Sequence, residues 1–575
     1  MHDLVIRGGM IVDGSGDEPR TGDIAISADR LVEVGGRAGP ARREIDADGA
    51  MVAPGWVDIH THYDGQATWD PHLSPSGWHG VTSVVMGNCG VGFAPAAPDR
   101  HDWLIGLMEG VEDIPGAALA EGMTWGWESF PEYLDALASM ERAVDVGTQV
   151  PHGAVRAYVM GERGARNMPA DEADIAQMGA IVEEGLRAGA LGFSTSRTML
   201  HRAVDGEPVP GTFAGAEELL GLGRAMGRAG HGVFELATDF GIGGMQGRFA
   251  DELDWMRQVA AESGCTVTFI LGQADRAPQE WRRILDLTEE AQAAGADVRA
   301  LVAARPAGLL LGLQSSLHPF MGHPSFAEIA DLSLEGQVAV LRGSEFRARL
   351  LAEGTGYTGA FNRTVAESFD KMFPLGDPPD YEPGPERSIA AIAAREGRDP
   401  AEVCLDHLLL RDGRELLYYP LLNYTGGDFE VIREQLDSPN TVLSLSDGGA
   451  HCGLICDAST PSYLLTHWAR DRSRGPTLPL QKVVRMQTHE TAACYGLDDR
   501  GLLRPGLRAD VNIIDLDALR LHPPHMVHDL PAEGRRLVQP VEGYVATALA
   551  GEITWQDGEA TGAMPGRLIR GPQKA

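Results

Sequence analysis

Short apolar runs alternate with stretches of helical periodicity through the middle of the chain. Eight runs have the length and apolar character of buried strands: 52–60, 81–88, 144–151, 190–196, 233–238, 266–271, 298–303 and 441–447. Helical stretches such as 172–188, 216–229 and 251–262 lie between several of them. A strand followed by a helix, repeated eight times, predicts an α/β fold of the closed (β/α)8 TIM-barrel type. An open doubly wound sheet is the alternative, but the glycine-rich phosphate loop typical of such sheets is absent from the expected place.

Both ends of the chain have a different pattern. Residues 1–52 contain short alternating runs separated by glycine and Asp-Gly turns, and 509–515 and 543–553 repeat this pattern. We therefore predict a small β-sandwich domain formed by both termini, residues 1–52 and 505–575, and a barrel domain at 53–504. The stretch between 304 and 441 is too long for a plain connection, so we expect an inserted lid or subdomain at about 309–400, before the last strand.

Composition and charge exclude several classes of function. The chain of 575 residues has a formal net charge of −34, which argues against nucleic acid and anionic membrane surfaces as partners. No run approaches the roughly 18 apolar residues that span a bilayer, and no signal peptide is visible. The six cysteines are scattered without a C-x-x-C pair and do not suggest a disulfide framework. We expect a cytoplasmic protein that acts on a small molecule, with a homo-oligomer left open.

Residues with metal-binding or catalytic chemistry gather at the ends of the predicted strands, where such barrels place their functional groups. The first strand ends in the pair His60 and His62, and in an extended chain both imidazoles lie on one side and can share a divalent ion. With 18 histidines in the chain, this pair alone proves little. Other strands supply Cys89, His152, Glu235, Asp447 and His451. Taken one at a time, Cys89 would be a buried thiol, His152 a loop histidine and Asp447 a turn residue. Glu235 would be a strand carboxylate that is costly to bury unpaired. Together, on one face of a barrel, they predict a metal site.

Several segments also match a known family. The runs 53–62, 87–95, 107–115, 127–131, 446–448 and 501–510 resemble the amidohydrolase superfamily, and within it the D-aminoacylase (N-acyl-D-amino-acid deacylase) branch. The resemblance covers nearly the whole chain and implies a metal-dependent hydrolase barrel with a terminal β-domain. It implies that His60 and His62 are metal ligands, that Cys89 is a thiolate ligand, and that Asp447 both binds metal and handles the proton.

The sequence departs from the family pattern in its second metal position. Some members of the superfamily bridge two metals with a modified lysine on strand four, but the three lysines of this chain lie away from the predicted strand ends. Members usually place a histidine after strand five and another after strand six, where this chain has Glu235 and Gln273. We expect one tightly bound Zn2+, with Glu235 as the residue that would replace a missing ligand. The basic residues with which the deacylases bind a substrate carboxylate, downstream of strand six and of the strand-eight aspartate, are also not found in this sequence.

These residues predict a mechanism with a Lewis acid, a nucleophilic water and a proton shuttle. Zinc suits a ligand set of histidine, cysteine and aspartate, and it activates both water and a carbonyl group. Asp447 is predicted to pass a proton from water to the leaving nitrogen. His152 and His451 are candidates to stabilise the oxyanion or orient Asp447, or else structural histidines. The predicted function is hydrolysis of the amide bond of an N-acyl amino acid, with a D-amino acid as one option, or of a related small amide. The alternatives are hydrolysis of a cyclic amide, lactone or ester, and ligand binding without catalysis.

Overall fold

Eight parallel strands form the central sheet of the computed structural model, which describes residues 1–238, 249–444 and 446–575. Their order, β16-β12-β11-β10-β9-β8-β7-β6, follows the chain. Each lies within one of the eight predicted runs: β6 (Trp56–Asp58), β7 (Val81–Met86), β8 (Asp145–Pro151), β9 (Gly192–Ser196), β10 (Val233–Ala237), β11 (Thr266–Ile270), β12 (Val298–Val302) and β16 (Thr441–Leu443). The strands are almost wholly buried because helices cover the outer face.

The sheet closes just beyond its first and last strands. Thr61 and Gly448 form a parallel bridge, and the N–H of His62 donates to the carbonyl of Gly448 at 2.8 Å. These contacts bring the end of β6 against the end of β16. The predicted TIM-type barrel is therefore confirmed.

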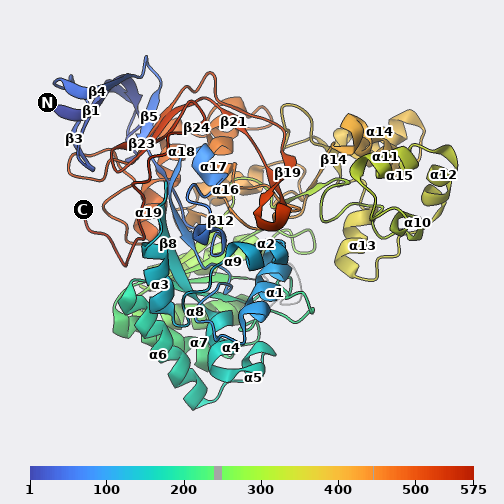
Figure 1. Ribbon diagram of the computed structural model, residues 1–575, viewed down its shortest axis with the longest axis horizontal. Coiled ribbons are helices and arrows are strands. Elements are labelled where there is room, and N and C mark those ends of the chain that lie inside the picture. The colour runs from blue at the N-terminus through green and yellow to red at the C-terminus, as the bar shows by residue number, and fades with distance from the viewer. Residues whose placement is uncertain (239–248, 445) are drawn as a thin grey trace.

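Helices pack side by side around the barrel (Figure 1). Two of the three helical stretches named from the sequence match the structure residue for residue, and the third is slightly longer. The outer helices include α3 (Phe130–Ala138), α6 (Glu172–Ala188), α7 (Ala216–Ala229), α8 (Phe249–Ser263), α9 (Glu280–Ala293) and α16 (Glu430–Asp437). The start of α6 is fixed locally, because the side chain of Asp171 accepts the backbone N–H groups of Ala173 and Asp174. Among the described residues, no helix combines the length and apolar character needed to cross a membrane.

Both chain ends contribute strands to one β-domain, as predicted. Its main sheet has nine strands, and both termini lie on the same side of the molecule (Figure 1). Strand β5 pairs with β1 on one side and with β17 on the other, which joins the N-terminal strands to the C-terminal ones. The strands are β1 (His2–Ile11), β2 (Arg20–Ser27), β3 (Arg30–Val34), β4 (Ala41–Asp46), β5 (Met51–Pro54), β17 (Val511–Ile514), β22 (Tyr544–Leu549), β23 (Glu552–Gln556) and β24 (Glu559–Ala560).

Two parts of the C-terminal region leave this sheet and contact the barrel. The hairpin β19 (His525–Leu530) and β20 (Gly534–Val538) reaches the loop after β16, where the N–H of Leu537 donates to the carbonyl of Cys452. The final residues pass β8, with the N–H of Ile569 donating to the carbonyl of Val146 at 2.7 Å. The C-terminal region thus braces the barrel at two separate places.

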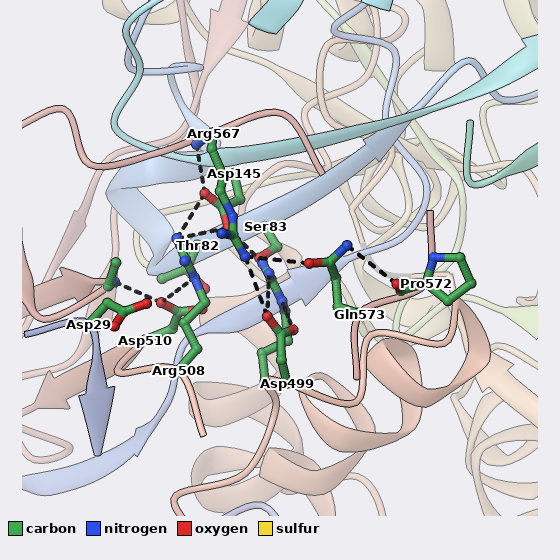
Figure 2. A network of polar contacts seen from close by, with 12 residues as sticks. Asp29, Thr82, Ser83, Asp145, Asp499, Arg508, Asp510, Arg567, Pro572 and Gln573 are labelled. Carbon is green, nitrogen blue, oxygen red and sulfur yellow. Dashed lines mark hydrogen bonds and ion pairs between the residues drawn. The ribbon is translucent and has the colours of Figure 1, made fainter. Parts of the chain in front are cut away.

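A buried network of charged side chains joins the β-domain to the barrel, and we call it the junction cluster (Figure 2). Arg500 pairs with Asp145 at 2.8 Å and with Asp499 at 2.9 Å. Arg508 pairs with the same Asp145 at 3.0 Å and with Asp510 at 3.3 Å. All five residues are almost fully buried. Because Asp145 is the first residue of β8, this cluster lies at the N-terminal ends of the barrel strands.

The long insertion before β16 has a hydrophobic core of its own, extending from Leu309 to Tyr419, and lies beside the barrel (Figure 1). Its elements are β13 (Gly308–Leu311), α10 (Pro324–Ala327), α11 (Leu334–Leu341), α12 (Ser344–Ala352), α13 (Ala360–Glu367), β14 (Phe373–Pro374), α14 (Ile389–Glu396), α15 (Pro400–Leu408) and β15 (Leu417–Pro420). Buried Glu382 ties this segment to the barrel side, because it pairs with Arg472 and His467, each at 3.0 Å. The insertion thus packs around a core of its own, and its standing as a lid or subdomain stays a prediction.

Candidate metal centre

Four of the side chains singled out in the sequence converge at the C-terminal ends of the barrel strands. His60 Nε2 lies 3.4 Å from Cys89 Sγ and 3.7 Å from Asp447 Oδ1. His62 Nε2 lies 3.3 Å from the same Asp447 oxygen. The ligand atoms of His60, His62 and Cys89 all lie within 4.8 Å of one another. Imidazole, thiolate and carboxylate donors at this spacing form a set that suits zinc.

The backbone at this centre is held in an unusual conformation. Cys89, Asp447 and His451 have φ angles of 56°, 51° and 47°, in the left-handed region that non-glycine residues rarely adopt. At Cys89 the surroundings impose this conformation, since its N–H donates to Glu235 Oε2 at 2.9 Å. Backbone strain of this kind concentrates at functional sites. Here it aims a thiol and a carboxylate at the same two imidazoles.

Glu235 lies within β10 and is fully buried. Its Oε2 accepts the N–H of Cys89, and its Oε1 is 3.8 Å from His60 Nδ1. Burial raises the pKa of Glu235 to about 8. Glu235 therefore lies beside Nδ1 of His60, whereas Nε2 of the same ring faces Cys89. Its predicted role as a metal ligand stays a prediction, whereas its support of Cys89 is a direct contact.

His451 belongs to this group of residues, and His152 is held elsewhere. His451 Nε2 is 3.9 Å from Asp447 Oδ2, and about a quarter of its side chain (27%) is exposed, so it can meet a substrate. Both nitrogens of His152 have other partners: Thr195 Oγ1 at 2.8 Å and Glu218 Oε1 at 2.9 Å. Burial lowers the pKa of His152. The catalytic roles of both histidines stay predictions, and the geometry places only His451 against Asp447.

Two residues near the centre escaped the sequence analysis. Glu112 is the last residue of α1 (His101–Glu112) and is buried, with Oε1 3.2 Å from His62 Nδ1 and Oε2 3.8 Å from His451 Nε2. His201, in the loop after β9, interacts electrostatically with His451 and His62, and burial lowers its pKa to about 3. Glu112 falls within the family-like run 107–115, which is the one signal that pointed to it.

The charges at the centre are not balanced by the protein. We call His60, His62, Cys89, Glu112, Glu235, Asp447 and His451 the metal-side cluster. Its three carboxylates form ion pairs only with histidines among the described residues, never with arginine or lysine. His60 Nδ1, His62 Nδ1, Glu235 Oε1 and both oxygens of Glu112 are buried without a hydrogen-bond partner in the part of the chain that the structure describes. Unpaired buried polar atoms are costly, so an added cation fits this arrangement.

Burial and the unpaired carboxylates also shift the pKa values of the predicted metal ligands. Burial lowers the pKa of His60 to about 4. Burial acts in the same direction on His62, but Glu112 and Asp447 outweigh it and raise the pKa of His62 to about 10. Burial and the surrounding carboxylates raise the pKa of the Cys89 thiol. A divalent cation would replace the proton on His62 and favour the thiolate form of Cys89. The donor set therefore fits a zinc ion.

The chain was also compared with known proteins. It matches the model of the amidohydrolase family over residues 43–559. It is 34% identical to D-aminoacylase of Alcaligenes xylosoxydans xylosoxydans over 194 residues, which cover 34% of this chain and 37% of that protein. It is 36% identical to N-acyl-D-aspartate deacylase of the same organism over a stretch of the same length, 34% of this chain and 36% of that protein. These two matches thus span little more than a third of the curated relatives.

Solved structures agree on the fold. A crystal structure of D-aminoacylase has a TM-score of 0.64 at 23% identity and covers 99% of this chain and 100% of its own. N-acyl-D-glutamate deacylase from Bordetella bronchiseptica, complexed with zinc and a phosphonate inhibitor, has a TM-score of 0.63 at 21% identity, with 99% of each chain covered. The resemblance to D-aminoacylases seen in the sequence is thus confirmed. The chain belongs to the amidohydrolase family of hydrolases.

Proposed function

We propose that this chain uses one tightly bound zinc ion to hydrolyse the amide bond of an N-acyl-D-amino acid. The observation that carries the proposal is the convergence of His60, His62, Cys89 and Asp447 in a cluster whose carboxylates have no arginine or lysine partner among the described residues. The substrate class rests on the relatives, two of which are named as an N-acyl-D-aspartate and an N-acyl-D-glutamate deacylase. The comparisons favour neither a cyclic amide or ester hydrolase nor a non-catalytic binding protein.

A bound zinc ion would supply a Lewis acid for the attacking water and the substrate carbonyl. The side chains supply the rest. Asp447 has one oxygen facing the two imidazoles and the other facing His451, and about a third of its side chain (32%) is exposed. It can therefore accept a proton from water and donate it to the leaving nitrogen. His451 is placed to orient Asp447 or to contact the substrate oxygen that gains charge.

The proposal is tested by measuring metal content and hydrolysis together. We expect the purified protein to hold about one equivalent of zinc and to deacylate N-acyl-D-amino acids faster than their L-isomers or cyclic amides. His62→Ala should weaken zinc binding so that the purified protein holds well under one equivalent of the metal. Asp447→Asn should lower kcat by roughly 10²- to 10⁴-fold, the usual contribution of a general acid–base group.

His528→Ala serves as the matched control, since His528 is exposed in β19 and outside the metal-side cluster. Its metal content and activity should equal those of the wild type. Full hydrolysis by metal-free protein would contradict the metal mechanism. Deacylation confined to L-substrates would overturn the assignment of substrate class and leave the metal site intact.

A further inference from the structure

The carboxylate of Glu112 lies in the metal-side cluster but outside the group of atoms that can share an ion. Helix α1 ends there, because Asp113 turns into the left-handed region with a φ of 52°. The helix end is tied to the loop after β16: the carbonyl of Glu112 accepts the N–H of Cys452, and Asp113 Oδ2 accepts the N–H of Gly453 at 3.2 Å. The helix therefore holds Glu112 in a fixed place between His62 and His451.

Glu112 has no arginine or lysine partner for its charge among the described residues, only His62 and His451. Its side chain is 1% exposed, and neither oxygen has a hydrogen-bond donor among the described residues. A carboxylate buried in this way is expensive unless a donor faces it. The nearest candidate is His62 Nδ1, at 3.2 Å from Oε1. A proton on that nitrogen would lie beside the Glu112 carboxylate and would leave His62 Nε2 with its lone pair free.

His62 Nε2 is the nitrogen that faces the shared oxygen of Asp447, at 3.3 Å. The two ring nitrogens thus face different carboxylates, one on each side of the imidazole. Metal-bound histidines commonly donate their second N–H to a carboxylate, which fixes the tautomer and the ring orientation. At His60 the arrangement is looser: Nδ1 lies 3.8 Å from Glu235 Oε1, beyond hydrogen-bond distance, and Nε2 faces Cys89.

We infer that Glu112 is a positioning residue: it selects the Nδ1–H tautomer of His62 and holds the ring so that Nε2 is presented to the metal. This inference rests on the proposed metal site. Glu112 tests the idea more cleanly than Glu235, because Glu235 also accepts the backbone N–H of Cys89 and its loss would disturb a second ligand. Glu112 reaches the predicted ligands only through an imidazole.

The first experiment measures the zinc dissociation constant of Glu112→Gln by competition with a chelating dye. We expect zinc binding to weaken by roughly 10- to 100-fold, the usual effect of removing such a partner. Glu109→Gln is the matched control: it carries the same substitution three residues earlier in α1, and its amide oxygen can still accept the N–H of Gly116, which Glu109 Oε1 accepts at 3.0 Å. Its zinc affinity should equal that of the wild type.

A second experiment separates positioning from a general structural role. Glu112→Gln is combined with His62→Ala, and zinc affinity is measured for both single variants and the double variant. If Glu112 acts through His62, its substitution adds less than about twofold once His62 is absent, because the two effects are not additive. A structural role would retain the full effect. Cobalt-substituted protein gives an independent readout, and its visible absorption bands should shift in Glu112→Gln and stay unchanged in Glu109→Gln.

Each outcome decides one proposal. Unchanged zinc affinity in Glu112→Gln, with zinc binding strongly weakened in His62→Ala, overturns the positioning role and leaves the proposed function standing. Unchanged metal binding in His62→Ala overturns the proposed function itself. Unfolding temperatures in the presence of a chelator show whether the variants fold. Should Glu112→Gln not fold, Glu112→Asp is the second variant, because it keeps the charge and draws the carboxylate back from His62. We expect it to weaken zinc binding several-fold. Wild-type zinc affinity in Glu112→Asp would equally overturn the inference.

Discussion

The barrel buries a charged cluster at each end, and the two clusters are built differently. At the N-terminal ends of the strands, the junction cluster pairs Arg500 and Arg508 with three aspartates, and Asp145 is shared between both arginines. At the opposite ends, the metal-side cluster gathers three carboxylates, three imidazoles and a thiol. Its carboxylates have no arginine or lysine partner among the described residues. One cluster is nearly neutral by itself, and the other needs a cation.

This difference separates structural burial of charge from functional burial. Buried ion pairs are tolerated when geometry and hydrogen bonds compensate their desolvation. The junction cluster meets that condition, since Asp145 also accepts the backbone N–H of Arg567 at 2.8 Å. In the metal-side cluster, both oxygens of Glu112 and Nδ1 of both His60 and His62 stay without hydrogen-bond partners among the described residues. Uncompensated charge at a strand end therefore marks a ligand site better than charge alone does.

The largest expected effect follows from breaking the junction cluster. Asp145→Asn leaves Arg500 and Arg508 buried beside a neutral side chain, and loss of one partner of a buried pair typically costs about 3–5 kcal/mol. We expect the free energy of unfolding, measured in urea, to fall by that amount. The kcat/KM of the folded fraction should stay at the wild-type value, because the metal-side cluster lies at the other end of the strands.

The matched variant for this experiment is Asp447→Asn, which removes a carboxylate from the unbalanced cluster. In metal-free protein it should lower the free energy of unfolding by less than Asp145→Asn does, because the lost contact with His62 is offset by relief of repulsion from Glu112 and Glu235. Its kcat with zinc present should fall by roughly 10²- to 10⁴-fold. If metal-free Asp447→Asn is destabilised as much as Asp145→Asn, the two clusters do not differ as described.

A third buried carboxylate, Glu382, sharpens the comparison through pH. Burial would raise its pKa, but hydrogen bonds from His467 and Arg472 outweigh burial and lower the pKa to about 2. A carboxyl group with a depressed pKa stabilises the fold above its unfolded pKa of about 4.3, and that stabilisation is lost as the pH falls toward 2. The shift corresponds to roughly 3 kcal/mol.

Urea unfolding at pH 7, 4.5 and 3 measures this contribution. Glu382→Gln should be less stable than wild type at pH 7, and the difference should shrink as the pH falls to 3. Glu386→Gln, four residues away and exposed, is the control and should follow the wild type at every pH. An undiminished difference between Glu382→Gln and wild type at pH 3 would show that Glu382 does not behave as a balanced ion pair.

The sequence predicts most of the fold because the signals are local. All eight barrel strands lie within predicted runs, and helix α6 begins and ends at the predicted residues. The predicted ligands His60, Cys89 and Asp447 also come together, because parallel strands bring their C-terminal ends to one face of a barrel. The apolar periodicity of the strands, together with the rule that barrel strands end on one face, is enough to locate these residues.

The remainder depends on contacts that no local pattern encodes. Glu112 lies at the end of a helix, and only the folded loop after β16 brings it to His62. His152 follows a strand as predicted, yet its ring turns to Thr195 and Glu218. The partners in the junction cluster are likewise far apart in sequence, with Arg500 355 residues from Asp145. Side-chain direction and long-range pairing arise only in the assembled structure.

Metal removal is the smallest of the three expected effects and tests the comparison directly. A ligand that binds only the folded state stabilises it by RT ln(1 + [L]/Kd), about 2.7 kcal/mol when free zinc is 100 times Kd. Chelation should therefore lower the free energy of unfolding of the wild type by that amount and that of His62→Ala by almost nothing. In Asp145→Asn, chelation should cost as much as in the wild type, within about 0.5 kcal/mol, because distant and independent sites act additively. A clearly different cost there would mean that the two ends of the barrel are energetically coupled, and the balance of each cluster could then no longer be judged on its own.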